Sequence, residues 1–337
     1  MVKVFYITKM ISAISKKIFP SFFQTLSYIK FHRKNHRFFI KDDHPVLIVC
    51  FDDYGLHGGL ADRLKGIISA YNLAIQNNYQ FKIHFNHPFT LDTYLSEFSI
   101  NWKAQGTDLK WSFGKTKFLT ARDNPTSVLS VIQAVQKKRI KIFLYTNLDF
   151  LHVLYPNSTD TGVIWKNSFH KLFQPSALLV KELDKAKLGL CFSNETVGFH
   201  TRFTTLLGDF EDVTERVLYG SEYDSFMKIV WKKMIDIYKG YKLKHVLLFS
   251  DSIRFIEFVK KESIKYNEVN ISIVPGVPAH SDRSGNDEET YLKTFLDFYF
   301  LSETKQIFLF KTGKMYASAF SKYAANVSGS PFHLIEF

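Results

Sequence analysis

The sequence predicts an α/β protein built from two domains of similar size that face each other across a cleft. Its 337 residues exceed one ordinary domain, and 46% of them are hydrophobic, which is enough for two buried cores. Apolar runs typical of buried strands alternate with helical patterns in two successive series, as expected for parallel sheets covered by helices. Open sheets of this kind bind ligands at the carboxyl ends of their strands.

The first series lies in residues 42–190 and predicts strands at 46–51, 81–85 and 140–145 and helices at 60–76 and 127–136. An irregular stretch around 155–167 precedes the expected domain boundary, which we place after residue 190. The second series, in residues 191–337, predicts strands at 196–203, 245–249, 269–274 and 306–310 and helices at 222–238, 253–261, 288–302 and 316–325.

The net charge of +12 belongs mainly to the N-terminal segment, residues 1–41. This segment holds nine Lys or Arg and no acidic residue, and the rest of the chain has 35 basic against 32 acidic residues. A nucleic-acid-binding protein would usually spread its basic residues over a folded face. We therefore expect no nucleic-acid partner.

Apolar residues from Val4 to Ile29 recur at helical spacing within this basic segment. No apolar run reaches the roughly 18–20 residues of a membrane span, and the continuous apolar core of a signal peptide is missing. A basic amphipathic segment suits an anionic membrane surface. The sequence therefore predicts a cytoplasmic protein that contacts the membrane periphery through residues 1–37. The alternative is a helix that packs on its own domain.

Cysteine usage favours a reducing compartment. Cys50 and Cys191 both lie in apolar, strand-like stretches, so we expect them to be buried free thiols. Two such residues form neither a disulfide framework nor a zinc site.

A glycine-rich segment joins the first predicted strand to the helix that follows, and its glycines are Gly55, Gly58 and Gly59. Glycines permit positive φ and a close approach of another molecule to the backbone. The amides at the start of the next helix would point at whatever occupies the loop, and Asp62 and Arg63 lie in its first turn. The spacing fits neither the P-loop nor the dinucleotide-binding fingerprint. An ordinary structural turn is the alternative.

A second candidate element is the strand predicted at 196–203. Side chains alternate along a strand, so Gly198, His200 and Arg202 share one face. A His and an Arg side by side are costly to bury without an anionic or hydrogen-bonding partner. The planar guanidinium matches phosphate oxygens, which predicts a phosphate site. The alternative is an edge strand whose polar face meets solvent.

The last third of the chain adds four polar candidates. Ser250 and Asp251 end a predicted strand and can cap the helix after it. Asp297 lies in an aromatic-rich helix, and Ser318 lies at the final helix, where a hydroxyl could meet a phosphate. The chain contains no Asp-x-Asp motif, so we expect no metal and no cofactor. Positive side chains and helix amides would neutralise a diphosphate leaving group instead.

Taken in order and spacing, four segments resemble the GT-B fucosyltransferase-like superfamily: GGLADRLKGIISAYNLA, VGFHTRF, VLLFSDS, and LDFYFLS followed by YASAFSKYA. This group includes α1,6-fucosyltransferases, nodulation fucosyltransferases and protein O-fucosyltransferases. The resemblance runs from about residue 45 to the end of the chain, and GGLADRLKG is its most specific motif. It implies a GT-B fold, in which two Rossmann-like domains face a cleft.

The resemblance implies that the second domain holds the nucleotide. His200 would contact the guanine or its ribose, and Arg202 would hold the β-phosphate. Asp297 would match the carboxylate that reads the guanine base. Ser250 and Asp251 match a Ser-Asp element that lies near the nucleotide in the family.

Further positions follow from the same resemblance. Ser318 would contact a phosphate, and the loop at Gly58 and Gly59, with Arg63 beside it, would close over the donor. Many members carry a second arginine where this chain has Phe203. Another nucleotide sugar is therefore an open alternative to GDP-fucose.

The function implied is an inverting, metal-independent transfer of fucose from GDP-fucose to a hydroxyl of a glycan acceptor, including a lipid-linked one. Arg202 would stabilise departing GDP, and Asp62 and Asp209 are the candidates for the carboxylate that orients or deprotonates the acceptor. The alternatives are a GT-B transferase with a different donor and an inactive glycan-binding protein of the same fold.

Overall fold

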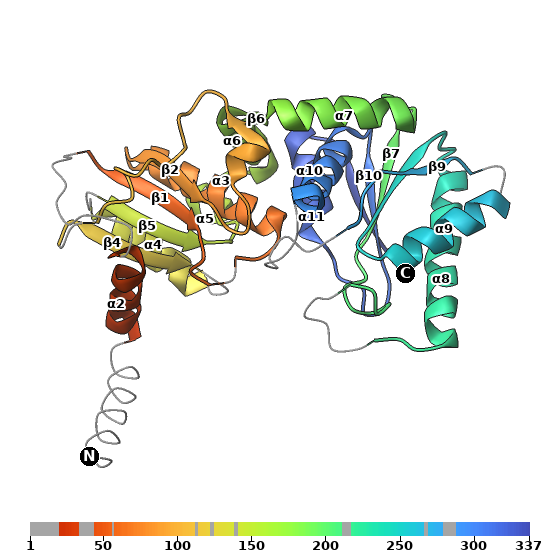
Figure 1. The fold of residues 1–337 in the computed structure, drawn as a ribbon, viewed down its shortest axis with the longest axis horizontal. Helices are drawn as coiled ribbons and strands as arrows, with labels where there is room; N and C mark the ends of the chain where they lie inside the picture. The colour runs from red at the N-terminus through yellow and green to blue at the C-terminus, as the bar shows by residue number, and fades with distance from the viewer. Residues whose placement is uncertain are drawn as a thin grey trace, which may run out of the picture.

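The computed structural model describes residues 20–33, 44–55, 57–111, 114–121, 125–137, 141–210, 217–265, 269–278 and 288–337, and the side chains of residues 20–24, 33 and 125 fall outside this description. Two parallel sheets lie side by side, one in each half of the chain (Figure 1). The predicted two-unit α/β architecture is therefore confirmed.

The first sheet has the strand order β2-β1-β5-β4, and every neighbouring pair is parallel. Every residue of β1 and β5 is buried, because central parallel strands are covered on both faces. The elements of this unit are β1 (Val46–Phe51), α3 (Leu60–Gln76), β2 (Gln80–Phe85), β4 (Thr116–Ala121), α4 (Pro125–Gln136) and β5 (Lys141–Thr146).

A two-stranded antiparallel ribbon and several helices follow beside this sheet. They are η1 (Leu91–Thr93), β3 (Leu95–Glu97), α5 (Leu151–Leu154), α6 (Thr161–Leu172) and β6 (Phe173–Pro175), with β3 paired to β6. The prediction of an irregular stretch around 155–167 is wrong from residue 161 on, because α6 begins there. Asp160 caps α6 by accepting a hydrogen bond from the Gly162 amide, and Trp165 and Phe169 bury its apolar face.

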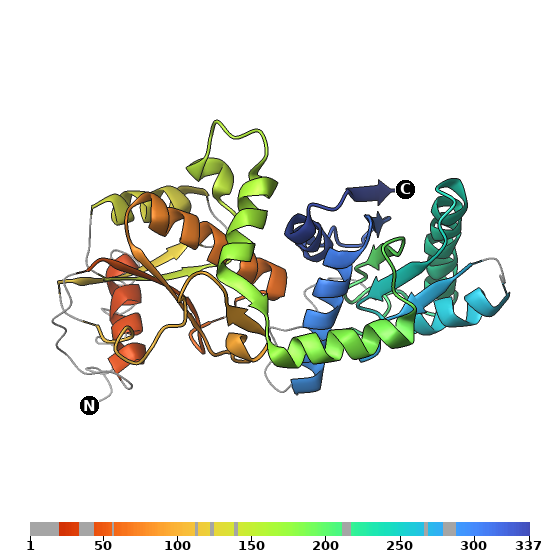
Figure 2. The same ribbon diagram turned by 90° about the horizontal axis from the view of Figure 1, so that it is seen from above.

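Helix α7 (Ala177–Leu190) links the two units and was not predicted. It runs from β6 toward the second sheet and lies beside both units (Figures 1 and 2). Ser176 caps its start by accepting a hydrogen bond from the Leu179 amide. The proposed domain limits, 1–41, 42–190 and 191–337, stay predictions.

The second sheet has the strand order β11-β10-β7-β8-β9, again with parallel neighbours. Helices α8 and α9 cover one face, where Phe199, Trp231 and Phe255 are buried in a common core. The elements are β7 (Val197–Thr201), α8 (Ser221–Gly240), β8 (Val246–Ser250), α9 (Ile253–Lys265), β9 (Ile271–Ile273), α10 (Glu288–Glu303), β10 (Ile307–Lys311), α11 (Ala319–Ser328) and β11 (Phe332–Glu336).

Helices α10 and α11 lie between the two sheets (Figures 1 and 2). One hydrophobic core includes residues of both units and of these two helices. The ring of Phe295 on α10 stacks on Tyr94 of the first unit with centroids 4.5 Å apart, and Phe89 packs on Tyr291 at 4.8 Å. The units are therefore joined by aromatic packing as well as by the chain.

The described part of the N-terminal segment is helix α2 (Pro20–Arg33). Tyr28 and His32 on this helix are buried against the first sheet, beside Phe118 and Tyr145. For this stretch the alternative of a helix that packs on its own domain is the one observed. Residues 1–19 and 34–41 lie outside the described residues, so the membrane contact of residues 1–37 stays a prediction.

The two cysteines differ in environment. Cys50 is buried in β1 as predicted, with its thiol pKa raised well above the ordinary value by burial. Cys191 is exposed, so its predicted burial is wrong. It is the C-cap of α7, where φ is 50° and the chain turns out of the helix rather than entering a strand.

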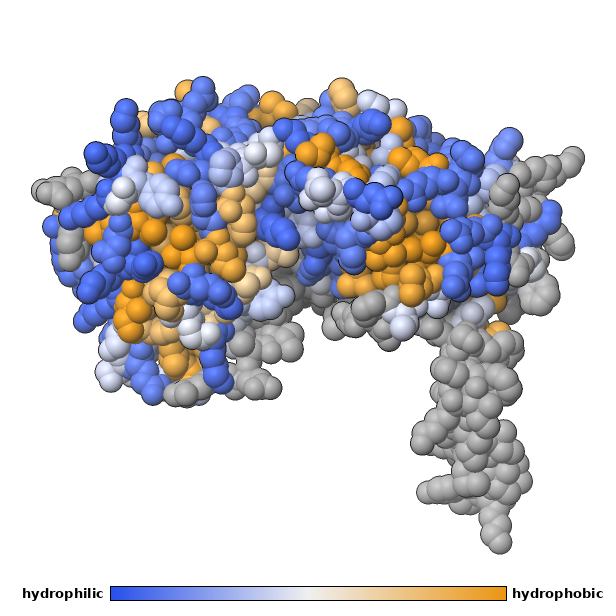
Figure 3. Space-filling model, turned by 180° about the vertical axis from the view of Figure 1, so that it is seen from behind, coloured by the Kyte–Doolittle hydropathy of each residue, from blue (hydrophilic) through white to orange (hydrophobic). Residues whose placement is uncertain are grey.

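Seen from behind, the surface is mostly hydrophilic, with hydrophobic patches on both units (Figure 3). Exposed large apolar residues include Phe98, Leu188, Tyr219 and Ile264. Among the described helices, none combines enough length with enough apolar character to cross a bilayer.

Candidate functional site

The carboxyl ends of β7 and β8 bring two predicted site residues together. Arg202 follows β7 directly, Asp251 follows β8 directly, and Arg202 Nε lies 3.5 Å from Asp251 Oδ2. The guanidinium is partly exposed and lies over the ring of Phe210, 4.6 Å from its centroid. An ion pair thus stands where an open parallel sheet is expected to meet its ligand.

Asp251 also shapes the turn that carries Arg202. Its two carboxylate oxygens accept hydrogen bonds from the backbone amides of Phe203, at 2.8 Å, and Thr204, at 2.7 Å. Thr204 has φ of 56°, a conformation that non-glycine residues adopt rarely and that needs such support. Burial raises the pKa of Asp251 to about 6, against the lowering effects of Arg202 and the two amides. The carboxylate therefore positions the turn, and it is ionised above about pH 6.

His200 is buried inside β7 and is neutral. Its Nδ1 lies 2.8 Å from the Ser321 hydroxyl of α11. Burial, and then the charge of Arg202, lower its pKa to about 3. The imidazole can therefore offer a hydrogen bond to a ligand without adding a positive charge.

The start of helix α11 lies beside this pair. The amide of Tyr316 donates to the carbonyl of Arg202 at 3.0 Å, and Ser318 caps α11 by accepting from the Phe320 amide at 3.2 Å. The helix N-terminus, with its positive dipole end, is thereby tied to the end of β7. The structure thus brings His200, Arg202, Asp251 and Ser318 to one edge of the second sheet.

Ser250 and Asp209 serve the start of α9 instead. The Ser250 hydroxyl accepts from the Ser252 amide, and Ser252, rather than Asp251, caps α9 by accepting from the Phe255 amide at 3.0 Å. Asp209 Oδ2 accepts from the Ser252 hydroxyl at 2.8 Å and from the Arg254 amide at 2.6 Å. Its Oδ1 is buried without a hydrogen-bond partner among the described residues. This carboxylate therefore supports the start of α9.

Asp297 forms a buried ion pair within α10. Lys293 Nζ, one turn earlier, lies 2.5 and 2.6 Å from its two oxygens. Burial raises the pKa of Asp297, and Lys293 opposes this shift. The lysine stem also lies against Gly276, where an added Cβ would stand 2.8 Å from Lys293 Cδ. A nucleotide base at Asp297 would have to share the carboxylate with Lys293.

In the first unit, the buried side chain of Arg63 supports the glycine segment through hydrogen bonds to backbone carbonyls. Its Nε donates to the Gly58 carbonyl at 2.9 Å and its Nη1 to the His87 carbonyl at 2.5 Å, and its side chain lies over the ring of Phe85. Arg63 is 0% exposed. The predicted contact of Arg63 with the donor is therefore replaced by a role in positioning the loop.

Gly58 and Gly59 lead directly into α3. Gly58 has φ of 75°, and a Cβ there would come within 2.9 Å of Asp62 Oδ2. Gly59 is the N-cap, and no side chain caps the helix there. The helix thus starts at a glycine with no side chain over its first amides, as expected for a close approach of another molecule.

The first turn of α3 faces α11 of the second unit. Asp62, 39% exposed, pairs with Lys65 at 2.5 Å, and Lys65 Nζ lies 5.8 Å from the centroid of the Tyr323 ring. The Tyr323 hydroxyl donates to Asp149 Oδ2 at 2.6 Å. Burial, and then Asp149 and Asp62, raise the pKa of Tyr323.

Asp149 was missed by the sequence analysis. The signal that could have found it is its position just after the predicted strand 140–145, at the carboxyl edge of the first sheet. It also accepts a hydrogen bond from the Leu151 amide, so it links the start of α5 to α11. One helix, α11, therefore touches His200 through Ser321 and the first unit through Tyr323.

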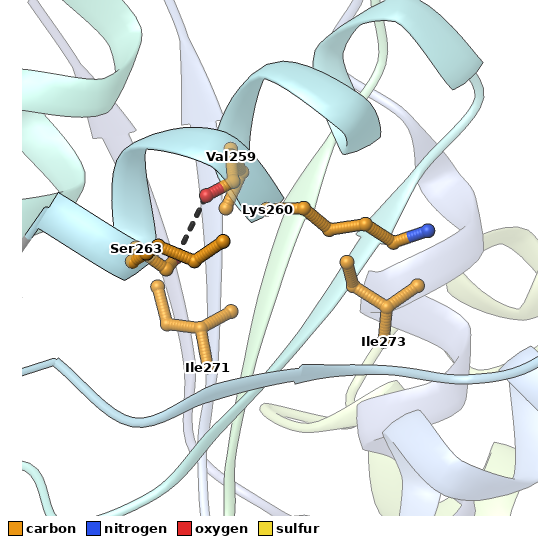
Figure 4. Close-up of a pocket in the computed structure, with 6 residues that line it drawn as sticks. Val259, Lys260, Ser263, Ile271 and Ile273 are labelled. Atoms are coloured by element: carbon orange, nitrogen blue, oxygen red, sulfur yellow. Dashed lines mark hydrogen bonds between the residues drawn. The ribbon is translucent and has the colours of Figure 1, made fainter.

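A separate pocket lies between α9 and β9, away from the site formed by His200, Arg202 and Asp251 (Figure 4). The strand β9 pairs with Val246–Leu248, the amino-terminal part of β8, and so lies away from Asp251. The pocket's two polar side chains are already engaged within α9, because the Ser263 hydroxyl donates to the Val259 carbonyl at 2.7 Å and Lys260 Nζ pairs with Glu257 at 2.7 Å. The lining residues are Val259, Lys260, Ser263, Ile264, Ile271 and Ile273.

Comparison with known proteins identifies the fold. No family model and no curated protein matches the sequence. A mutant of Arabidopsis thaliana FUT1 in complex with GDP superposes with a TM-score of 0.60 and 14% identity, covering 92% of this chain and 74% of that one. NodZ α-1,6-fucosyltransferase soaked with GDP-fucose gives a TM-score of 0.55 and 15% identity over 87% of this chain and 95% of that one.

The fucosyltransferase NodZ from Bradyrhizobium matches with a TM-score of 0.52 and 13% identity, covering 83% of this chain and 92% of that chain. The chain therefore has the GT-B fold of fucosyltransferases, as the motifs predicted.

Proposed function

We propose that this protein is a glycosyltransferase that transfers fucose from GDP-fucose to a hydroxyl of a glycan. One observation carries the proposal. Arg202, His200 and the N-terminus of α11 meet at the carboxyl end of β7, and the same helix faces the glycine segment and Asp62. The similarity in fold to structures solved with GDP and GDP-fucose supports this choice of donor.

In this proposal the diphosphate lies at Arg202 and at the start of α11. The acceptor oxygen attacks the anomeric carbon, the bond from that carbon to the diphosphate oxygen breaks, and GDP leaves with the electron pair. Arg202 and the helix amides stabilise the charge that develops on the leaving group. We expect this charge to be neutralised without a metal.

Asp62 is the better of the two proposed acceptor carboxylates. It is partly exposed beside the glycine segment, whereas Asp209 is occupied at the start of α9. In the proposed reaction Asp62 accepts the proton of the acceptor hydroxyl, and Lys65, 2.5 Å away, holds the carboxylate in place.

One specific observation supports the alternative that the donor is a nucleotide sugar other than GDP-fucose. Phe203, where many family members carry a second arginine, is fully buried and packs on Phe255 with centroids 4.7 Å apart. Its side chain therefore points into the core and leaves the diphosphate to Arg202. A GT-B transferase that uses another nucleotide sugar is the alternative.

The test is a thermal-shift and calorimetric panel of GDP-, UDP- and CMP-sugars with Arg202→Ala. We expect GDP-fucose to stabilise the wild type and Arg202→Ala to weaken GDP binding about ten- to hundredfold, since a charge-assisted hydrogen bond contributes about 1.5–3 kcal/mol. Lys305→Ala is the matched control, because it removes a cation of the same domain that pairs with Glu195 at the surface. It is expected to bind GDP as the wild type does.

Three outcomes would contradict the proposal in different ways. Stabilisation by a UDP- or CMP-sugar alone would reassign the donor. Saccharide binding without nucleotide binding would indicate an inactive glycan-binding protein. Equal GDP affinity in Arg202→Ala and Lys305→Ala would remove Arg202 from the site. Acceptors, including lipid-linked saccharides, are then compared by mass spectrometry of the products.

A further inference from the structure

The loop between β1 and α3, residues 52–59, contains the glycine segment. It is held by side chains that the proposed reaction does not use. It begins with Asp52, directly after β1. The amide of Tyr54 donates to Asp52 Oδ1 at 3.0 Å, and His57 Nε2 lies 2.7 Å from the Asp52 carbonyl. Asp52 is therefore the anchor of this loop on the sheet.

A buried chain of hydrogen bonds connects Asp52 to helix α2. The Tyr145 hydroxyl donates to Asp52 Oδ2 at 2.9 Å and lies 2.8 Å from His32 Nε2. A phenol has a single proton, and when this one is given to an ionised Asp52, the Tyr145 oxygen accepts from the Nε2–H of His32. All three side chains are almost completely buried.

Helix α2 also touches the loop directly through Tyr54. The Tyr54 hydroxyl donates to the Ser27 hydroxyl at 2.9 Å. The rings of Tyr28 and Phe31 pack on the Tyr54 ring with centroids 4.3 and 5.4 Å away. Helix α2 thus contacts Tyr54 through both its hydroxyl and its ring.

Two further contacts of the loop, one near its start and one near its end, are made without α2. Arg63 holds the Gly58 carbonyl, and His87 Nδ1 lies 2.7 Å from Asp53 Oδ1. These contacts belong to the first unit alone. The contacts that link the loop to α2 are those of Tyr54, made directly with Ser27, and of Asp52, made through Tyr145.

We propose that Tyr145 and His32 are positioning residues, which act through Asp52 to hold the glycine segment in the place from which it faces the donor. The docking of α2 on the first sheet then sets the activity of the site. This inference rests on the proposed function, because the segment matters only if a donor lies opposite it. A ligand or surface that draws α2 away from the sheet would lower the rate of transfer.

The first test compares two tyrosine hydroxyls of the same unit. Tyr145→Phe removes the link to Asp52, and Tyr79→Phe removes a buried hydroxyl that donates to the Val135 carbonyl at 3.1 Å, away from the loop. We expect Tyr145→Phe to lower kcat about tenfold, the change that corresponds to one lost buried hydrogen bond, with GDP affinity unchanged within about twofold. Tyr79→Phe is expected to retain the wild-type kcat.

A second measurement does not depend on activity. Amide hydrogen exchange of peptides covering residues 52–59 is expected to be about tenfold faster in Tyr145→Phe than in Tyr79→Phe. His32→Leu is expected to match Tyr145→Phe in both rate and exchange. His32→Gln, whose side-chain amide can still donate to Tyr145, is expected to restore most of both.

Equal exchange in Tyr145→Phe and Tyr79→Phe would overturn the inference, as would equal losses of kcat in the two variants. Faster exchange with an unchanged kcat would overturn the link from the loop to catalysis. Absence of transfer in the wild type contradicts the proposed function instead, and the exchange comparison still decides whether Tyr145 positions the loop.

Discussion

At the scale of single residues, the candidate site contains a buried histidine that carries no charge. His200 is almost completely buried in β7 with its Nδ1 on Ser321, and its pKa lies at about 3. The unfolded chain, whose histidine titrates near pH 6.5, takes up a proton that the folded protein refuses. The stability contributed by a neutral His200 is therefore fully present above pH 6.5 and is lost as the pH falls toward 3.

The prediction concerns His200→Gln and the pH dependence of unfolding. When the pH is lowered from 7.5 to 4.5, the free energy of unfolding is expected to fall by about 2–3 kcal/mol less in the variant than in the wild type. The difference accumulates at roughly 1.4 kcal/mol per pH unit below pH 6.5. Urea unfolding at the two pH values measures the difference. His44→Gln, at an exposed position, is the control, and equal slopes in both variants would contradict the assignment.

At the scale of elements, Gly66 determines how closely α3 lies on the first sheet. A Cβ at this position would stand 2.1 Å from the Thr146 carbonyl oxygen at the end of β5. The obstacle is backbone of a central strand, so it cannot move aside as a side chain would. This contact places the start of α3, and with it Gly58 and Asp62, at the carboxyl edge of the sheet.

We predict that Gly66→Ala destabilises the fold by roughly 1–3 kcal/mol or more, because the added methyl forces the helix from the strand. Gly189→Ala in α7, where no heavy atom lies within 4 Å of the added Cβ, is the matched substitution. It is expected to stabilise by about 0.5–1 kcal/mol through helix propensity. Chemical unfolding of both variants measures the two signs, and a neutral Gly66→Ala would refute the close contact.

At the scale of the whole molecule, α10 and α11 make the two units one cooperative structure. The carbonyls near the end of α11 accept from the first unit as well, at Ser328 from Lys166 and at Val327 beside His170 Nε2, 2.7 Å away. Together with Tyr323–Asp149 and the Phe295–Tyr94 stack, they join the units along both helices. The two halves are expected to unfold in a single transition.

Phe295→Ala tests this joint. It is expected to cost about 3–5 kcal/mol, as for other buried aromatic truncations, and to separate calorimetric unfolding into two transitions. Phe98→Ala removes an aromatic residue that is 63% exposed and is expected to leave one transition. A single transition in Phe295→Ala would mean that the remaining contacts suffice to couple the units.

The sequence by itself determined the alternation of buried strands and helices. Val46–Phe51 and Leu60–Gln76 fall where they were predicted, and His200 and Arg202 do share the end of one strand. Such patterns can be recognised in a sequence because a strand covered on both faces must be apolar and a helix must present one apolar stripe. The GT-B fold was predicted from the resemblance of four motifs to a known superfamily, and the contact between the Arg202 carbonyl and the Tyr316 amide before α11 was found only in the structure.

Only the tertiary structure decided which polar side chain meets which partner. It occupies Arg63 with loop carbonyls and Asp209 with the start of α9, and it sets Asp149 against Tyr323, 174 residues away. A carboxylate or a guanidinium looks the same in a sequence whether it holds a loop or awaits a ligand. Its partner depends on packing between distant segments, because hydrogen bonds form wherever the folded chain brings a donor to an acceptor.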